Sequence, residues 1–485
     1  MPEIPTAPRQ TMAQDNPLSR LQPGEGVHIV GIGGAGMSAI ARVLLQQGYR
    51  VSGSDRELNA LTEALQREGA SIYEGVDATR IGAARLVLAS SAIAEQHAEL
   101  VEARVQGLTV VRRTDFIADL MHGREVVAVA GTHGKTTTSA MIAHILQASG
   151  REPGYIIGSV APDLGSNAAA GKGAAFVVEA DEYDHMFLGL RPDVAVLGSA
   201  EYDHPDCFPN HAAMLGAFRR FINLLPETGP LIACLDDPAA AQLAEERRAQ
   251  GLPVQGFSSQ REATWQARQL HLRGDGCSEF EALHQGRVAG PVTLRLPGEH
   301  NVRNALAALA VAIQQNVPFA AAATALAAFR GTGRRLELRG VVDDVLVIDD
   351  YAHHPTAIRL TLAAARARWP GHRLWALWQP HTYSRSQALQ SGYVTAFADA
   401  DELLVTDIYA AREEPLPGLD GASLAAAVAR PRARHTPTGA DALQLLVREV
   451  KGPALILILS AGDAPRIGEQ FLARGGGDAG AARSV

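Results

Sequence analysis

Nine consecutive residues decide the fold class of this chain: Val129-Ala130-Gly131-Thr132-His133-Gly134-Lys135-Thr136-Thr137. They follow an apolar run, Glu125 to Ala130, that predicts a strand, and they open a helix predicted over Thr137 to Ala148. At such a turn the unpaired backbone N–H groups and the helix dipole face a phosphate, and a lysine reaches the β- and γ-phosphate oxygens. The hydroxyl of Thr136 is placed to bind Mg²⁺. Because Val129 occupies the first glycine position of the general P-loop pattern, the alternative is a glycine turn with a surface lysine.

The first part of the chain carries a second glycine turn, Gly31-Ile32-Gly33-Gly34-Ala35-Gly36. An apolar run from Val27 precedes it, and an apolar helical stretch and a strand from Tyr49 to Gly53 follow it. With Asp55 beyond that strand, the pattern fits the dinucleotide fingerprint, which alone indicates an NAD-dependent oxidoreductase. A turn that only packs a helix on a strand is the other interpretation. Two phosphate-binding turns in successive domains instead favour two phosphorylated ligands, one of them a nucleotide diphosphate.

Three α/β domains are predicted, because short apolar runs alternate with helical stretches along the whole chain. The expected divisions are a disordered leader (1–23), a Rossmann-like first domain (24–123), a central P-loop domain (124–331), a Rossmann-like third domain (332–470) and a flexible tail (471–485). Period-two alternation between Trp265 and Leu296 predicts an antiparallel flank on the central sheet. The segment Gly331 to Arg335 is predicted to be a hinge.

Polar clusters follow three of the predicted buried strands. They are Glu179-Ala180-Asp181-Glu182-Tyr183-Asp184, Asp203-His204-Pro205-Asp206 and Asp349-Asp350-Tyr351-Ala352-His353-His354-Pro355-Thr356. The first two lie where a Mg²⁺–ATP site needs carboxylates, although an acidic strand end alone is more often a solvated loop. The third suits a charged amine or a phosphate, or caps the next helix.

The composition of the chain argues against several classes of function. The 485 residues carry a net charge of -8, which disfavours sequence-independent nucleic-acid binding. No apolar stretch reaches membrane-spanning length and no signal peptide is evident, so membrane insertion is not expected. The three cysteines, Cys207, Cys234 and Cys277, fit no metal-site spacing and predict reduced thiols. A cytoplasmic location is therefore expected. The chain is expected to be a monomer or a homodimer.

Taken together, these motifs resemble the Mur ligase family of peptidoglycan synthesis, from about Val27 to Gly468. The resemblance implies an ATP site formed by Gly131, Thr132, His133, Gly134, Lys135, Thr136, Thr137, His300, Asn301, Asn304, Arg334, Arg335 and Asp350. It implies Mg²⁺ held by Thr136, Glu179 and His204. ATP and Mg²⁺ are thus the expected cofactors, and an acyl phosphate is the implied intermediate. The implied catalytic residues are Lys135, Arg335 and His354, the last as acceptor of the amine proton.

Two further motifs resemble the family members that join L-alanine to UDP-N-acetylmuramate, the two small-molecule substrates expected here. The first motif is the glycine turn that runs from Gly31 to Ser38. It implies that the N-terminal domain binds UDP through Gly31, Gly33, Gly34, Gly36, Met37, Ser38, Asp55 and Ser90. The second, Gln379 to Arg385, implies an amino-acid site of Tyr351, His353, His354, His381 and Arg385.

Several departures leave the amine open. Tyr183, Ala352 and Thr382 stand where serine, glycine and arginine are usual, and Ser199 and Pro205 replace the common asparagine and leucine. Some of these features resemble the murein peptide ligase, a relative that attaches the tripeptide L-Ala-γ-D-Glu-diaminopimelate to the same sugar acid. An NAD-dependent oxidoreductase and a regulatory P-loop protein that uses ATP only to change shape are the more distant alternatives.

Overall fold

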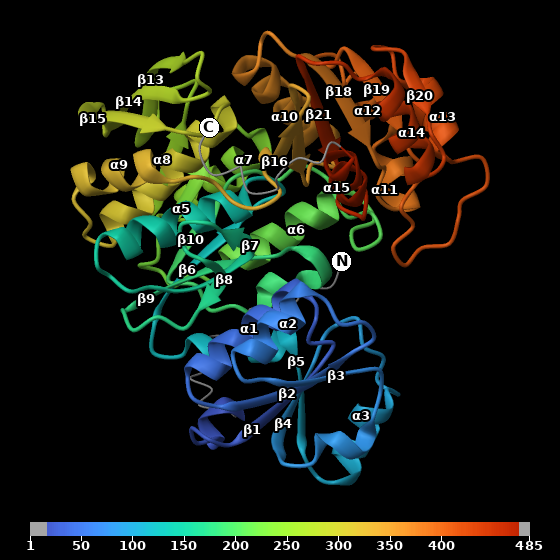
Figure 1. Ribbon diagram of the computed structural model, residues 1–485. Coiled ribbons are helices and arrows are strands. Elements are labelled where there is room, and N and C mark those ends of the chain that lie inside the picture. The colour runs from blue at the N-terminus through green and yellow to red at the C-terminus, as the bar shows by residue number, and fades with distance from the viewer. Residues whose placement is uncertain (1–16, 475–485) are drawn as a thin grey trace, which may run out of the picture.

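The computed structural model describes residues 17–474, which form three sheets with helices packed against them (Figure 1). Each sheet draws its strands from one stretch of the chain, residues 26–112, 125–294 and 337–459. In Figure 1 the first unit lies at the bottom, and the central and third units lie side by side above it. The predicted α/β class with three successive sheets is confirmed.

The first sheet has five parallel strands in the order β3-β2-β1-β4-β5. Its elements are β1 (Gly26–Val30), α1 (Ala35–Gln46), β2 (Arg50–Asp55), α2 (Ala60–Arg67), β3 (Ser71–Glu74), β4 (Ala84–Ala89), α3 (Ala98–Val105), β5 (Thr109–Arg112) and α4 (Arg113–Phe116). β1 is buried along its whole length, as expected for a parallel strand covered on both faces. The strand order reverses between β1 and β4, so the glycine turn after β1 lies at a topological switch point, where such sheets bind ligands.

The central sheet has ten strands in the order β15-β14-β13-β12-β11-β10-β6-β9-β7-β8. Its strands are β6 (Glu125–Ala130), β7 (Gly154–Ala161), β8 (Ser166–Ala169), β9 (Ala175–Glu179), β10 (Val194–Leu197), β11 (Leu231–Cys234), β12 (Val254–Ser258), β13 (Trp265–Leu272), β14 (Ser278–His284) and β15 (Arg287–Leu294). Its helices are α5 (Lys135–Ala148), α6 (His211–Ile222), α7 (Pro238–Ala249), α8 (Glu299–Gln314) and α9 (Phe319–Ala328). Strands β13 to β15 are antiparallel, which confirms the predicted flank. Strand β6 lies between β10 and β9, so the ends of all three strands meet at the phosphate turn.

The third sheet has six strands in the order β16-β17-β21-β18-β19-β20. Its elements are β16 (Glu337–Val342), β17 (Val345–Asp350), α10 (Pro355–Arg368), β18 (Arg373–Trp378), α11 (Tyr383–Ala388), α12 (Gln390–Tyr393), β19 (Glu402–Val405), α13 (Gly421–Ala427), β20 (Ala433–His435), α14 (Gly439–Glu449), β21 (Ala454–Leu459) and α15 (Pro465–Ala473). The apolar runs of β17 and β21 are buried throughout, as the sequence predicts. The edge strand β16 runs antiparallel to β17 and was not predicted.

Both predicted disordered ends are shorter than expected where the structure describes them. A 3₁₀ helix covers Pro17–Arg20, and Leu18 and Leu21 are buried against the first domain. At the other end, Phe471 is buried against the third sheet from within α15. These apolar side chains anchor their segments, because their burial removes apolar surface from water. The rest of the predicted leader and tail, residues 1–16 and 475–485, lies outside the described residues.

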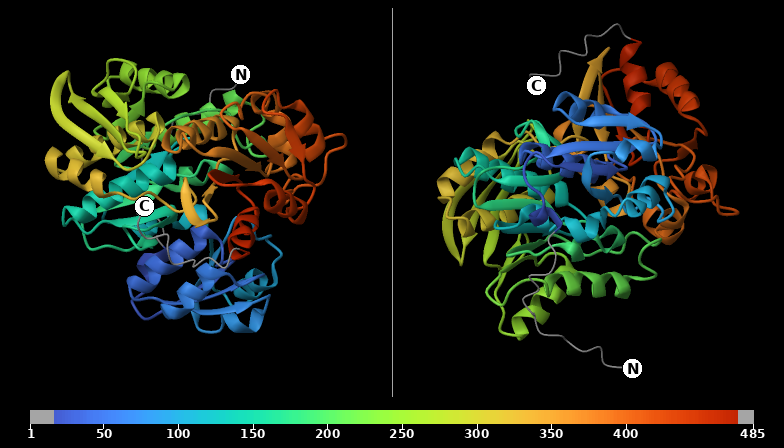
Figure 2. Two further views of the ribbon diagram at one scale, coloured as in Figure 1. Left: turned by 45° about the horizontal axis from the view of Figure 1, so that its top comes forward. Right: turned by 90° about the horizontal axis from the view of Figure 1, so that it is seen from below.

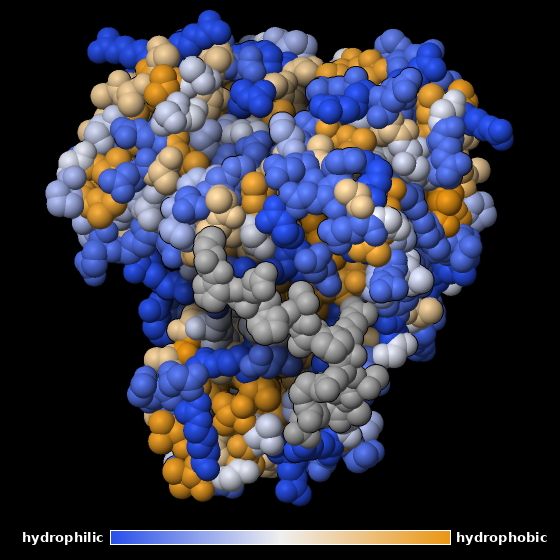
Figure 3. Space-filling view, turned by 180° about the vertical axis from the view of Figure 1, so that it is seen from behind, coloured by the Kyte–Doolittle hydropathy of each residue, from blue (hydrophilic) through white to orange (hydrophobic). Residues whose placement is uncertain are grey.

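The first and central domains touch through α1 and the β7–β8 hairpin. The Arg42 guanidinium donates to Asn167 Oδ1 over 2.7 Å, and the backbone N–H of Ala170 donates to the Gln46 side chain. Figure 2 shows the same grouping of the three units from two further directions. From behind, hydrophilic residues cover most of the visible surface of the two upper domains, with scattered apolar patches (Figure 3). None of the helices within residues 17–474 is long and apolar enough to cross a membrane.

Candidate functional site

The phosphate turn connects β6 to α5 and depends on two glycines. Gly131 has φ +136° and Gly134 has φ +78°, both in the region that favours glycine. A Cβ at Gly134 would lie 2.6 Å from Asn304 Oδ1, and one at Gly131 would lie 2.9 Å from the backbone nitrogen of Ser199. Neighbouring elements therefore pack directly against the turn, which leaves no room for side chains.

Lys135 begins α5 and is held by a carboxylate. Its Nζ donates to both Glu182 oxygens, over 2.8 and 2.9 Å, and to Gly131 O over 2.7 Å. Burial opposes the lysine's charge, but the carboxylates of Glu182, Asp181 and Glu179 outweigh burial and raise the pKa of Lys135. The lysine is therefore charged, and Glu182 occupies the place of an anionic ligand beside it.

Two of the predicted metal ligands lie together at the end of β9 and the start of α5. The Thr136 hydroxyl donates to Glu179 Oε1 over 3.1 Å, and the N–H of Gly158 donates to Glu179 Oε2 over 2.6 Å. Burial and the neighbouring Asp181 raise the pKa of Glu179, against the effect of Lys135. A cation stabilises the charge of a partly buried carboxylate such as Glu179, and oxygen donors are the ligands that Mg²⁺ prefers.

The third predicted metal ligand, His204, lies on the other side of Glu182. His204 Nε2 is 3.7 Å from Glu182 Oε1, so this carboxylate stands between the histidine and Lys135. The backbone of His204, within the loop between β10 and α6, has φ +55°, which is uncommon outside glycine. Lys135, Glu182 and His204 thus form one charged group.

The start of α8 closes the opposite side of the phosphate turn. The Asn304 amide donates to Asn301 Oδ1, and the Asn301 amide donates to the backbone carbonyl of Pro297. Burial, with Arg303 and Arg335 nearby, lowers the pKa of His300 to about 4. A neutral imidazole beside a phosphate turn suits the flat, uncharged base of a nucleotide rather than its phosphates.

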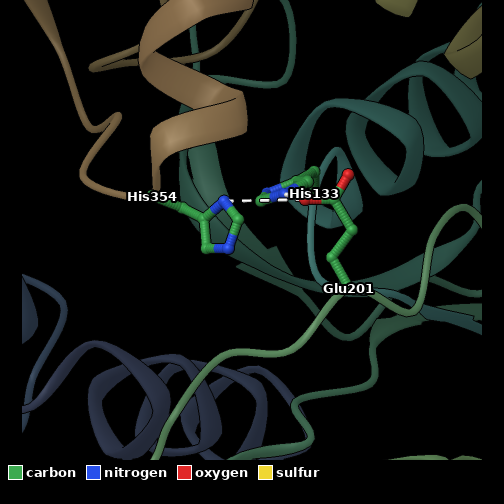
Figure 4. Close-up of side chains that lie close together, drawn as sticks. All are labelled: His133, Glu201 and His354. Carbon is green, nitrogen blue, oxygen red and sulfur yellow. Dashed lines mark hydrogen bonds and ion pairs between the residues drawn. The ribbon is translucent and has the colours of Figure 1, made fainter. Parts of the chain in front are cut away.

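The third domain contacts the phosphate turn through His354, which caps α10. Figure 4 shows His354, His133 of the turn and Glu201 of the loop after β10 pointing toward one another. His133 Nε2 is 3.4 Å and His354 Nδ1 is 3.7 Å from Glu201 Oε2, and one ligand atom of each residue lies within 4.8 Å of the others. The Thr356 hydroxyl also donates to Glu201 over 2.6 Å. Glu201 therefore joins the phosphate turn to the third domain.

A second contact between the same two domains is a buried ion pair. Arg385 Nε donates to Asp203 Oδ1 over 2.6 Å, and both side chains are 5% exposed. Burial alone would raise the pKa of Asp203, but Arg385 and the neighbouring histidines hold it well below its usual range. The other arms of the guanidinium approach His381 Nδ1 at 3.0 Å and His204 Nδ1 at 3.2 Å. The predicted amino-acid site therefore meets the predicted metal site at Arg385.

The N-terminal glycine turn is held by the end of β2. The N–H of Gly33 donates to Asp55 Oδ2 over 2.7 Å, and the Asn59 amide donates to Gly33 O. Gly31 has φ +80°, and a Cβ there would lie 3.2 Å from Ser90 Cβ at the end of β4. The turn is thus fixed between β2 and β4, and the first N–H groups of α1 are left to face a ligand.

Family models match three successive parts of the chain: the Mur ligase family catalytic domain over residues 26–125, the Mur ligase middle domain over 129–312, and the Mur ligase glutamate ligase domain over 334–462. A UDP-N-acetylmuramate–L-alanine ligase of Roseiflexus sp. (strain RS-1) is 44% identical over 460 residues, which cover 92% of this chain and 98% of the relative. The chain belongs to the Mur ligase family.

Further Mur ligases resemble it in sequence and structure. A UDP-N-acetylmuramate–L-alanine ligase of Renibacterium salmoninarum is 42% identical over 92% of this chain and 95% of its own length. The UDP-N-acetylmuramate-alanine ligase of Thermotoga maritima has a TM-score of 0.78 at 26% identity and covers 93% of this chain and 98% of its own. A murein peptide ligase of Psychrobacter arcticus has a TM-score of 0.69 at 29% identity, covering 94% and 99%. The oxidoreductase alternative is not favoured.

The hinge arginines of this Mur ligase have different surroundings. Arg334 donates to Asp349 over 3.1 Å and to Ser460 O over 2.6 Å, so its guanidinium is already engaged within the third domain. Arg335 has its guanidinium carbon 5.3 Å from the centre of the Tyr351 ring. Its charge lowers the pKa of His300 across the domain boundary, although burial lowers that pKa more. Arg335 is therefore the arginine of this segment whose charge acts on His300 of the central domain.

The side chains of three predicted site residues are already buried in the core or hydrogen-bonded within the protein. Met37 is 2% exposed and packs in the core, and the buried Ser38 hydroxyl donates to Ala35 O, so neither side chain is free for UDP. Both nitrogens of His354 are engaged, because Nδ1 accepts from the N–H of Thr356 and Nε2 faces Tyr202 O at 3.2 Å. Burial also lowers the pKa of His354 to about 4. Helix capping therefore describes His354 in this arrangement better than proton transfer.

The sequence predicts no individual role for Glu182 or Asp203, although both stand in the polar clusters expected at the Mg²⁺–ATP site, and it does not single out Glu201. Glu182 and Asp203 stand inside motifs quoted for their metal-binding neighbours, so the signal was present but was assigned to the adjacent residues. Glu201 lies two residues before Asp203, and nothing in the chain's local pattern indicated that it would reach the third domain.

Proposed function

We propose that this Mur ligase joins L-alanine to the carboxylate of UDP-N-acetylmuramate, with ATP converted to ADP and phosphate through an acyl phosphate. One observation carries the proposal: the ion pair of Arg385 with Asp203 brings the third domain's cationic site next to the charged group around Lys135. A carboxylate activated at the phosphate turn and an amine held by the third domain would meet there. The relatives that carry the name UDP-N-acetylmuramate–L-alanine ligase at 42–44% identity support this choice.

The residues fit a hard divalent cation at the phosphate turn. Glu179 offers a partly buried carboxylate whose pKa is raised by burial, and the Thr136 hydroxyl lies 3.1 Å from it. His204 adds a nitrogen beyond Glu182. Mg²⁺, when bound, supplies positive charge that offsets the crowded phosphates and carboxylates.

The side chains of this enzyme have separate roles in the rest of the reaction. Lys135 moves its charge from Glu182 to the transferred phosphoryl group, where charge placement accounts for most of the catalysis. His300 and Asn304 border the nucleotide, and Arg335 covers it from the third domain. The cation of Arg385, held in place by Asp203, lies beside His381 and would attract the carboxylate of the amino acid. Closure of the domains excludes water from the acyl phosphate.

The test is phosphate release from ATP with UDP-N-acetylmuramate and each amino acid in turn, with the product identified by mass. We expect release with L-alanine and only modest selectivity against glycine or serine, because a methyl-sized difference is worth about 1–3 kcal/mol. A direct competition between L-alanine and L-Ala-γ-D-Glu-diaminopimelate at equal concentration separates the two ligase types. Predominant tripeptide addition would assign the chain to the murein peptide ligases.

We place the enzyme in the cytoplasm, as a monomer or homodimer. Cys207, Cys234 and Cys277 are free thiols in the described structure, which suits a reducing compartment. Sedimentation of the purified chain distinguishes the two oligomeric states.

A further inference from the structure

Two histidines and a glutamate meet where the phosphate turn faces the third domain (Figure 4). His133 comes from the turn itself, Glu201 from the loop between β10 and α6, and His354 is the residue that caps α10. Their side chains are 21%, 35% and 7% exposed, so an ion from solution can reach them although they are partly withdrawn from water. None of the three belongs to the predicted Mg²⁺ site. The group is therefore a separate candidate for ion binding.

The distances between the three side chains suit a four-coordinate metal ion. His133 Nε2 and His354 Nδ1 lie 3.4 and 3.7 Å from Glu201 Oε2, and one ligand atom of each residue lies within 4.8 Å of the others. Around a tetrahedral ion with bonds of about 2.0–2.2 Å, the ligand atoms lie about 3.3–3.6 Å apart. The two distances to Glu201 nearly match this geometry, and the imidazoles need to move by roughly 1 Å to complete it.

The glutamate and His354 are in the protonation states that a metal ion requires. His354 Nε2 faces the Tyr202 carbonyl oxygen at 3.2 Å, which places the ring proton on Nε2 and the lone pair on Nδ1, the atom beside Glu201. Burial, with the charge of His133, lowers the pKa of His354 to about 4, so the ring is neutral at neutral pH. Burial opposes the charge of Glu201, but hydrogen bonds from His133 and Thr356 hold its pKa at about 2. Both groups can therefore bind a cation without losing a proton.

The contacts around these side chains are of the kind that surrounds metal ligands. A backbone carbonyl on the second ring nitrogen, as Tyr202 provides for His354, typically orients a metal-bound histidine. The Thr356 hydroxyl donates to Glu201 over 2.6 Å and orients the carboxylate in the same way. An ion at His354 Nδ1 would replace the 3.2 Å bond from the N–H of Thr356, which lowers the affinity for the ion by roughly fivefold. Two imidazoles and a carboxylate outweigh the loss of that single bond.

We propose that His133, Glu201 and His354 form a binding site for a divalent transition-metal ion such as Zn²⁺, which fastens the third domain to the phosphate turn and slows turnover when it is bound. Imidazole nitrogens favour such ions, whereas Mg²⁺ prefers oxygen ligands in an octahedral shell. Because the ligands come from two domains, the bound ion opposes the opening through which products leave. This site goes beyond the proposed ligase activity, and it does not depend on which amine is ligated.

Co²⁺ is the probe for this site, because its visible absorption reports four-coordinate ligation by nitrogen, and Zn²⁺ is the competitor. Both ions are titrated into the full chain with Mg²⁺ in excess, so that Mg²⁺ fills the predicted oxygen site. We expect a single visible Co²⁺ band that Zn²⁺ removes. His354→Asn loses the imidazole but keeps a favourable N-cap residue, and Glu201→Gln loses the charge but keeps a hydrogen-bond acceptor. Each change should weaken Co²⁺ binding by at least about 10- to 100-fold.

Two further variants show where the ion binds. Glu179→Gln alters the predicted Mg²⁺ site and should leave the Co²⁺ band unchanged. His271→Asn, which removes an exposed histidine of β13, is the matched control and should also have no effect. Absence of the band in the natural sequence would overturn the proposal. A band that survives in both His354→Asn and Glu201→Gln, or one that is lost in Glu179→Gln, would also overturn it, since the ion would then lie elsewhere.

Small-angle scattering tests the effect of the ion on the domains. Zn²⁺ alone should lower the radius of gyration of the natural sequence, and it should leave that of Glu201→Gln unchanged. Zn²⁺ should also slow phosphate release while Mg²⁺ stays in excess. An unchanged radius with the ion bound would refute its role in holding the domains together. Circular dichroism of each variant confirms its fold, and because His354→Asn and Glu201→Gln change different elements, either one can test the site if the other misfolds.

Discussion

Replacing Lys135 by alanine should slow ligation strongly and also destabilise the central domain. Lys135 Nζ contacts both oxygens of Glu182 at 2.8 and 2.9 Å, and the Glu182 side chain is 1% exposed. Without the lysine, a buried carboxylate loses its main partner, a change that typically costs about 3–5 kcal/mol. His204, 3.7 Å from the same carboxylate, offsets part of this, so we expect about 3 kcal/mol.

The activity loss has a separate cause and a separate magnitude. The lysine is the side-chain cation of the phosphate turn, and removal of one such positioned donor lowers kcat by roughly 10²- to 10³-fold. Phosphate release measures this loss, and urea unfolding followed by circular dichroism measures stability on the same preparation. Lys172→Ala is the control, because Lys172 is an exposed lysine of the same domain.

The double variant Lys135→Ala/Glu182→Gln decides between these effects. It removes both charges, so most of the lost stability should return while ligation stays as slow as in Lys135→Ala. Near-normal turnover in Lys135→Ala would show that this turn does not bind ATP. Additive stability losses in the double variant would refute the claim that the two side chains stabilise each other.

Three other predictions follow from the same contacts. Glu179→Gln and His204→Ala should each raise the Mg²⁺ concentration needed for half-maximal activity, and an unchanged requirement in a magnesium titration would remove both from the metal site. Small-angle scattering should show compaction when an ATP analogue and UDP-N-acetylmuramate are added, less so in Glu201→Gln, and superimposable curves at saturation would contradict closure. Because burial holds the pKa of His300 and His354 at about 4, below the ordinary 6.5, stability should be full above pH 6.5 and fall as the pH drops toward 4. Unfolding midpoints across this window should drop less steeply in His300→Asn, and a flat profile in the natural sequence would refute the argument.

The sequence predicts those features of the fold that local patterns determine. Buried parallel strands such as β6 and β21 read as continuous apolar runs, and the glycine turns mark where strand becomes helix. The β7–β8 hairpin and the edge strand β16 were missed, because glycine and polar residues interrupt their apolar runs. Strand order and the contacts between domains depend on tertiary packing, which no local pattern encodes.

In the candidate site, too, local motifs predict some residues, and contacts between domains determine the others. Motifs place Lys135, Thr136 and Glu179 together, since the ends of neighbouring parallel strands meet at one edge of a sheet. His381 and Arg385 belong to one predicted motif, Gln379 to Arg385, and they meet at 3.0 Å, with α11 beginning between them at Tyr383. What the sequence lacked was the partner from another domain, because residues that meet across a domain boundary share no local pattern.

Asp203 and His204 are adjacent in the chain, and together they contact side chains of the third and the central domain. The left-handed backbone at His204, with φ +55°, lets consecutive side chains serve different groups. Asp203 binds Arg385 of the third domain, while His204 approaches both Glu182 beside the phosphate turn and the same guanidinium. A movement of the third domain that shifts Arg385 therefore changes the surroundings of His204, which lies next to Glu182, the partner of Lys135. The loop after β10 thus couples closure over the amine to the charge balance at the phosphate.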